Sequence, residues 1–65
     1  MNVPRLKGII AERGLTQAKV AKYIGISDRT FYLKMKKGVF GTDEVQKMVD
    51  LLNIQDPADI FLSKR

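Results

Sequence analysis

Hydrophobic residues recur along this chain at intervals of three and four, which is the spacing of one face of an α-helix. The clearest stripe consists of Val45, Met48, Val49 and Leu52. No stretch alternates hydrophobic and polar residues in the way that a half-buried strand does. The pattern therefore predicts an all-α fold.

Helix-start and helix-stop residues divide the chain into five predicted helices. Small polar side chains favour N-caps, whereas glycine and asparagine favour left-handed helix ends. On these signals the helices begin at the caps Asn2, Thr16, Ser27, Thr42 and Asp56, and the first four end at Gly14, Gly25, Gly38 and Asn53. The expected inward-facing residues before the fourth helix are Leu6, Ile9, Ile10, Val20, Ala21, Ile24, Ile26, Phe31, Met35 and Phe40.

The second and third predicted helices are separated by only a few residues around Gly25. Such a short hinge makes two helices cross steeply, and the small Ala21 allows a close crossing. The third helix is capped by Ser27, is polar on one face and ends in Lys36 and Lys37. A helix of this kind fits a DNA major groove. The segment from about 16 to 37 therefore predicts a helix-turn-helix, and DNA binding is the leading hypothesis.

The charge is distributed unevenly along the chain, whose net charge is +5. Residues 1–38 contain nine lysines and arginines against two acidic residues, a net +7, whereas residues 39–65 contain three against five, a net −2. The basic half is also the half with the predicted hinge. A polyanionic partner accounts for this arrangement, because cations that neutralise phosphates release condensed counterions. The alternative is a solvated surface that only aids solubility.

Composition argues against several other classes of protein. The chain has no cysteine and no histidine, which removes disulfides and the ordinary zinc ligands, and it has no glycine-rich phosphate loop. We expect no catalytic residues, no metal and no cofactor. No hydrophobic run approaches the ~20 residues that span a bilayer, and no signal peptide is recognisable. The expectation is one soluble domain over residues 1–65, with no membrane partner.

The run LTQAKVAKYIGISDRTFYLKMKKG, residues 15–38, resembles the helix-turn-helix of phage-repressor and Cro-like regulators, the XRE family. The matching positions are Gln17, Ala21, Gly25, Ile26 and Phe31, and residues 40–61 are similar to the last two helices of the same proteins. The resemblance implies a compact five-helix, lambda-repressor-like domain that binds DNA in the cytoplasm of a bacterial or phage-infected cell. The chain differs from the family where Lys34 replaces a usual hydrophobic residue, and we infer that the adjacent Met35 takes over its place in the core.

Residues opposite Phe31 and Met35 on the third helix are expected to face the bases. A step of ~100° per residue selects Asp28, Arg29, Tyr32, Leu33 and Lys36. Arg29 is the leading candidate, because a guanidinium binds guanine in a bidentate manner. The structural alternatives are a plain helix-start charge at Asp28, a half-buried ring at Tyr32 and a core position for Leu33. The resemblance adds Gln17, at the start of the second helix, as a base or phosphate contact.

Phosphate contacts are expected from lysines and from residues at helix N-termini, where backbone N–H groups are free. The predicted phosphate-contacting residues are Thr16, Lys19, Ser27, Lys34, Lys36, Lys37 and Thr42. Arg13 and Lys22 are interpreted as ordinary solvated charges.

Three consecutive hydrophobic residues, Ile60, Phe61 and Leu62, lie close to the end of the chain. Helix periodicity does not bury all three in one protomer, so at least one is expected to be exposed. We predict a dimer interface here, because related repressors pair through this region. The alternatives are an exposed hydrophobic terminus and contact with a downstream domain.

The leading hypothesis is a sequence-specific, double-stranded DNA-binding regulator. The resemblance points to a phage or mobile-element repressor that binds its operator as a weak homodimer, which need form only on DNA. The chain is also consistent with the N-terminal piece of a longer repressor. A different class is a protein-interaction module of the same fold, such as an antitoxin or antirepressor, and a weaker third hypothesis is binding of single-stranded RNA.

Overall fold

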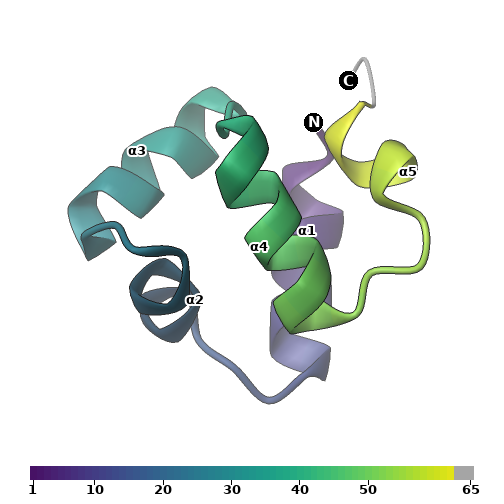
Figure 1. Ribbon diagram of the computed structural model, residues 1–65, viewed down its shortest axis with the longest axis horizontal. Helices are drawn as coiled ribbons and strands as arrows, with labels where there is room; N and C mark the ends of the chain where they lie inside the picture. Colours follow the sequence, from purple (N-terminus) through teal and green to yellow (C-terminus); the bar gives the residue numbers. More distant parts are fainter. Residues whose placement is uncertain (63–65) are drawn as a thin grey trace.

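The computed structural model describes residues 1–62, and every regular element within that range is an α-helix (Figure 1). The helices are α1 (Val3–Glu12), α2 (Gln17–Ile24), α3 (Asp28–Lys37), α4 (Thr42–Leu52) and α5 (Pro57–Phe61). The prediction of an all-α fold with five helices is confirmed. Helices α2 and α3 form the predicted helix-turn-helix.

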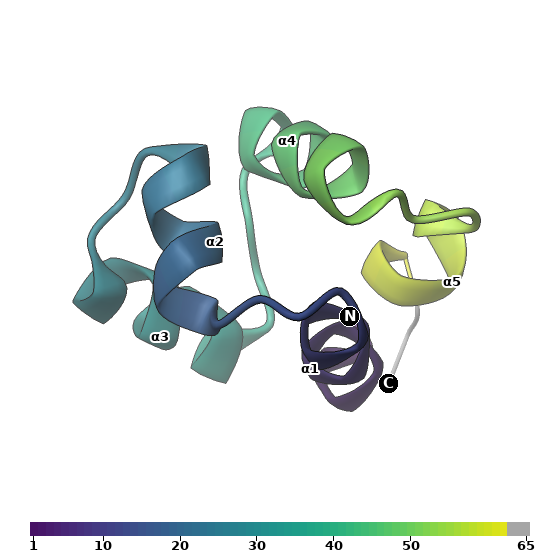
Figure 2. The same cartoon turned by 90° about the horizontal axis from the view of Figure 1, so that it is seen from below.

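The helix-turn-helix occupies one end of the molecule. In both views α2 and α3 lie on one side, α5 lies on the other, and α1 and α4 lie between them (Figures 1 and 2). Helix α2 packs against α1, α3 and α4, and α1 packs against α5. The backbone N–H of Asn2 donates to the carbonyl oxygen of Ile60 at 2.7 Å, which ties the start of α1 to α5.

The core is hydrophobic and takes side chains from all five helices. Eleven hydrophobic residues of the described chain are buried: Leu6, Ile10, Val20, Ala21, Ile24, Phe31, Met35, Met48, Leu52, Ile54 and Ile60. Ile9, Ile26, Phe40 and Val49 pack against them and are partly buried. The rings of Phe31 and Phe40 lie 5.4 Å apart and are tilted by 53°, so Phe40 anchors the connector after α3 to the core.

Three of the five predicted N-caps are formed by the expected side chains. Asn2, Thr16 and Ser27 each accept a hydrogen bond from the backbone N–H three residues later, at 3.1, 3.2 and 3.1 Å. The cap predicted at Thr42 is wrong, because the N-cap of α4 is Gly41 and Thr42 is the first helical residue. Asp56 stands at the N-cap of α5, but its side chain makes no capping bond.

The turn between α2 and α3 is closed by a left-handed glycine. Gly25 has φ +87°, and its N–H and that of Ile26 both return to the carbonyl oxygen of Ala21, each at 3.0 Å. This geometry satisfies the last carbonyl groups of α2, and only glycine adopts it at no steric cost. The turn therefore fixes the angle at which α3 leaves α2.

Arg13 has a structural role that the sequence interpretation missed. Its Nε donates to the carbonyl oxygen of Leu52 at 2.7 Å, and its Nη2 donates to that of Asn53 at 3.4 Å. These carbonyl groups belong to the negative end of α4, where a cation is stabilising. Arg13 thus connects the end of α1 to the end of α4 and is not simply a solvated charge.

Candidate nucleic-acid interface

Helix α3 has one buried face and one exposed face. Phe31 and Met35 are 1% and 4% exposed, whereas Tyr32 and Leu33 are 61% and 43% exposed. The half-buried alternative for Tyr32 and the core alternative for Leu33 are therefore wrong. Asp28, Arg29, Lys36 and Lys37 are exposed as well. The residues selected from the sequence as base contacts on α3 thus form an outward surface.

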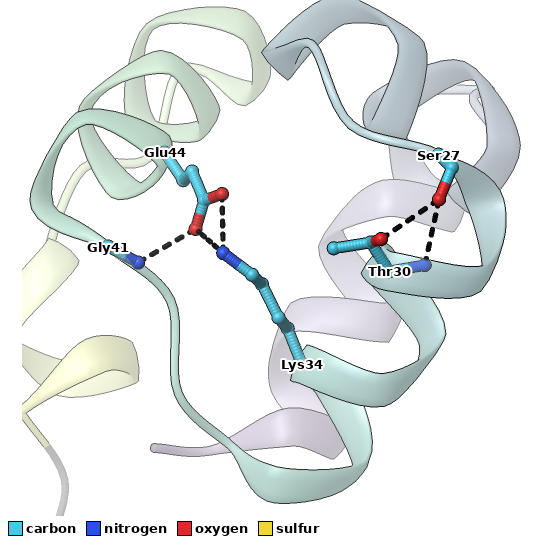
Figure 3. Close-up of polar contacts among 5 residues, drawn as sticks. All are labelled: Ser27, Thr30, Lys34, Gly41 and Glu44. Carbon is cyan, nitrogen blue, oxygen red and sulfur yellow. Dashed lines mark hydrogen bonds and ion pairs between the residues drawn. The ribbon is translucent and has the colours of Figure 1, made fainter.

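The start of α3 is held by Ser27 and Thr30, as Figure 3 shows. The Ser27 hydroxyl accepts from the backbone N–H of Thr30 at 3.1 Å and donates to the Thr30 hydroxyl at 2.9 Å. Both interactions lie beside Asp28 and Arg29 and hold the first turn of the helix. Within residues 1–62 Arg29 has no ion-pair partner, so its guanidinium group is available to a ligand.

Among the described residues Lys34 is the one lysine of α3 that forms an ion pair. Its Nζ lies 2.6 and 2.7 Å from the two carboxylate oxygens of Glu44 on α4, and the N–H of Gly41 donates to Glu44 Oε1 at 2.8 Å (Figure 3). The hydrogen bond from Lys34, with that from Gly41, holds the pKa of Glu44 below its ordinary value. Lys34 was predicted to contact phosphate, but in the structure it links α3 to α4.

The inference that Met35 replaces the usual core residue is confirmed. Met35 is buried, while Lys34 next to it is only partly buried. The ion pair with Glu44 satisfies the charge of Lys34, which is partly buried beside this core position.

Three predicted contacts from two helices lie around one cleft of about 320 Å³. They are Gln17 of α2 and Tyr32 and Lys36 of α3, and the cleft is also lined by Val3, Lys7 and Met35. Lys7 of α1 was not singled out from the sequence. Its position four residues after Val3 places both on one face of α1, but only the packing of α1 shows that this face borders α3.

The other predicted phosphate contacts are distributed over several exposed sites. Thr16, Lys19, Ser27, Lys37 and Thr42 are all exposed, and the side chains of Thr16 and Ser27 cap α2 and α3. Thr42 lies in the first turn of α4, which also contains Asp43 and Glu44. Phosphate contact stays a prediction for these residues.

The predicted dimer residues have different environments. Ile60 is 1% exposed and belongs to the protomer core, so its assignment to a dimer contact is corrected. Phe61 is partly buried, and Leu62 is 75% exposed. The expectation that at least one of the three is exposed is confirmed, and Leu62 is the most exposed of them. A dimer contact through Phe61 and Leu62 stays a prediction.

Among residues 1–62 no three histidine, cysteine or carboxylate side chains are grouped closely enough to hold a metal ion. No helix in the same range is long and hydrophobic enough to cross a membrane.

A tight turn that fixes two short helices, with the second helix exposing arginine, tyrosine and lysine, defines a helix-turn-helix DNA-binding domain. Residues 5–62 match the family model of the Cro/C1-type HTH DNA-binding domain. The chain therefore belongs to this family, and DNA binding is the activity that the family shares. Neither the curated proteins nor the solved structures include a match to this chain.

Proposed function

We propose that this protein is a sequence-specific regulator of transcription, of the repressor kind found in phages and other mobile elements. In this proposal α3 lies in the major groove of duplex DNA. Arg29 reads a guanine, while Asp28, Tyr32, Leu33 and Gln17 contact neighbouring bases. Lys19, Lys36 and Lys37 bind phosphates, together with the N-terminal turns at Thr16, Ser27 and Thr42. Occupation of the operator then prevents transcription.

The observation that carries the proposal is the two-sided character of α3. Its buried residues fix the helix against α2 and the core, and its outward residues include the Arg29 guanidinium group, which has no ion-pair partner among residues 1–62. Packing of one face prevents the helix from turning about its own axis. The outward side chains therefore keep a constant register with the base edges. Base contacts of this kind distinguish sequences, whereas phosphate contacts only position the protein.

The proposal includes a dimer on DNA. Helices α3 and α5 lie at opposite ends of a molecule whose principal extents are 26 × 23 × 20 Å (Figure 1). Two copies that pair near Leu62 place their α3 helices on the outside. Operators of helix-turn-helix dimers contain half-sites about one turn of DNA, ~34 Å, apart, so the proposal requires the two α3 helices of such a pair to lie at this separation.

Selection from a pool of random duplexes tests the proposal. We expect enrichment of one short sequence in two inverted copies, with centres about 10 base pairs apart. Enrichment of a single half-site would support base reading and contradict the dimer. A pool that stays random after repeated selection, or absence of duplex binding at low salt, would contradict the proposed function.

A further inference from the structure

Helix α1 lies outside the helix-turn-helix but contributes a cation to the same surface. Lys7 lines the cleft of about 320 Å³ that is also lined by Gln17, Tyr32 and Lys36. Val3 of α1 and Met35 of α3 complete the lining. The cleft thus brings residues of three helices together around one hollow next to the exposed face of α3.

The charges around this cleft are not compensated by any described residue. Its lining contains two lysines and no carboxylate. Within residues 1–62 neither Lys7 nor Lys36 has an ion-pair partner, whereas Arg5, Arg13 and Lys34 each have one. Two ammonium groups that border one hollow repel each other. An anionic ligand between them is attracted to both, and this attraction offsets the repulsion.

The cleft is also hydrophobic in part. Val3 is only partly buried and presents aliphatic groups, and Met35, which is 4% exposed, also borders the cleft. The lysine side chains, the Gln17 amide and the Tyr32 phenol supply the polar groups. The backbone of DNA has the complementary character, because each deoxyribose presents C–H groups and is flanked by two anionic phosphates.

We infer that this cleft binds the backbone of duplex DNA, with one deoxyribose over Val3 and its two flanking phosphates on Lys7 and Lys36. The inference rests on the proposed function and extends the interface to α1. Lys7 then acts as a phosphate ligand that positions the protein on the duplex and adds affinity for any sequence.

Two variants of α1 that lose the same charge test the inference. Lys7→Gln removes the cation at the cleft. Arg5→Gln is the matched control, since Arg5 is an exposed cation two residues away that pairs with Asp59 of α5 and lines a different cleft. Binding of both variants and the parent protein to a random-sequence duplex is measured over a series of salt concentrations, and thermal unfolding checks that each is folded.

The slope of log K against log salt is the readout, because each phosphate contact contributes about 0.9 to its magnitude. We expect the slope of Lys7→Gln to be shallower by about 0.9, and that of Arg5→Gln to equal the parent slope. An unchanged slope for Lys7→Gln, or equal losses in the two variants, would overturn the inference while leaving the proposed function intact. If the parent protein fails to bind duplex, the proposed function falls, and this inference falls with it.

Discussion

Lys34 of α3 and Glu44 of α4 form an ion pair whose Nζ and Oε2 atoms lie 2.6 Å apart. The Glu44 carboxylate also accepts from the N–H of Gly41, so one side chain binds α3 and caps the start of α4. The pair spans the connector that Phe40 anchors to Phe31. Two contacts of different chemistry, one ionic and one aromatic, therefore fix α3 relative to α4.

Replacement of Glu44 by Gln is expected to destabilise the protein by about 1–2 kcal/mol, because the charged hydrogen bond from Lys34 is lost in a partly buried place. The effect depends on pH in a defined direction. The folded-state pKa of Glu44 lies below the ordinary value, so its contribution is complete at neutral pH and is lost as the pH falls below about 4.5. The difference in Tm between the parent protein and Glu44→Gln should therefore shrink in acid.

Asp43→Asn is the matched control for this experiment. It also removes one carboxylate from the first turn of α4, but Asp43 is exposed and has no ion-pair partner within residues 1–62. Thermal unfolding from pH 3 to 7 should give a larger pH-dependent difference for Glu44→Gln than for Asp43→Asn, because Glu44 accepts hydrogen bonds from Lys34 and Gly41. A constant difference for Glu44→Gln across this range would show that the carboxylate charge contributes nothing.

Most of the fold could be predicted from the sequence because its signals are local. Each helix cap bonds a backbone group within a few residues of itself, as at Asn2, Thr16, Ser27 and the left-handed Gly25. The spacing of Phe31 and Met35 indicates directly which face of α3 is buried. Thr42 failed as a cap because Gly41 precedes it and Glu44 supplies the capping interaction from within the helix. Gly41 and Thr42 are both residues that favour the start of a helix. Only the backbone conformation shows that Gly41 is the N-cap.

The site could be predicted less completely, since its remaining features depend on packing between helices. Lys34 and Arg13 look like ordinary basic residues in the sequence, but one reaches Glu44 and the other reaches the end of α4, 39 residues away along the chain. Lys7 borders the α3 surface only because α1 packs beside it. Such long-range neighbours leave no periodic signal in a single sequence.

Arg13→Met is expected to lower the free energy of unfolding by about 1–2 kcal/mol, because the carbonyl groups of Leu52 and Asn53 lose a charged donor. Methionine retains most of the aliphatic part of the side chain, so the loss measures the hydrogen bonds. Lys22→Met, which removes an exposed cation without an ion-pair partner in residues 1–62, should stay within about 0.5 kcal/mol of the parent protein. Urea unfolding measures both, and equal effects would contradict the capping role.

Arg29→Ala should weaken binding to the selected operator by about 1–3 kcal/mol and change binding to random duplex much less, because a base contact is lost. Lys37→Ala should weaken binding to both duplexes equally and make the salt slope shallower by about 0.9. Titration of each variant with operator and random DNA at two salt concentrations separates the two roles. Equal losses from both variants on both DNAs would refute the assignment of Arg29 to base reading.

Substitutions at Leu62 and Ile60 test dimer formation and protomer stability separately. Leu62→Glu changes a side chain that is 75% exposed, so thermal unfolding should stay close to that of the parent protein. Binding to an operator with two half-sites should weaken because a charge enters the pairing surface, while binding to a single half-site is retained. Ile60→Ala should instead cost about 2–5 kcal/mol of stability, since this side chain lies in the core. If Leu62→Glu binds the full operator as tightly as the parent protein does, the dimer does not form through Leu62.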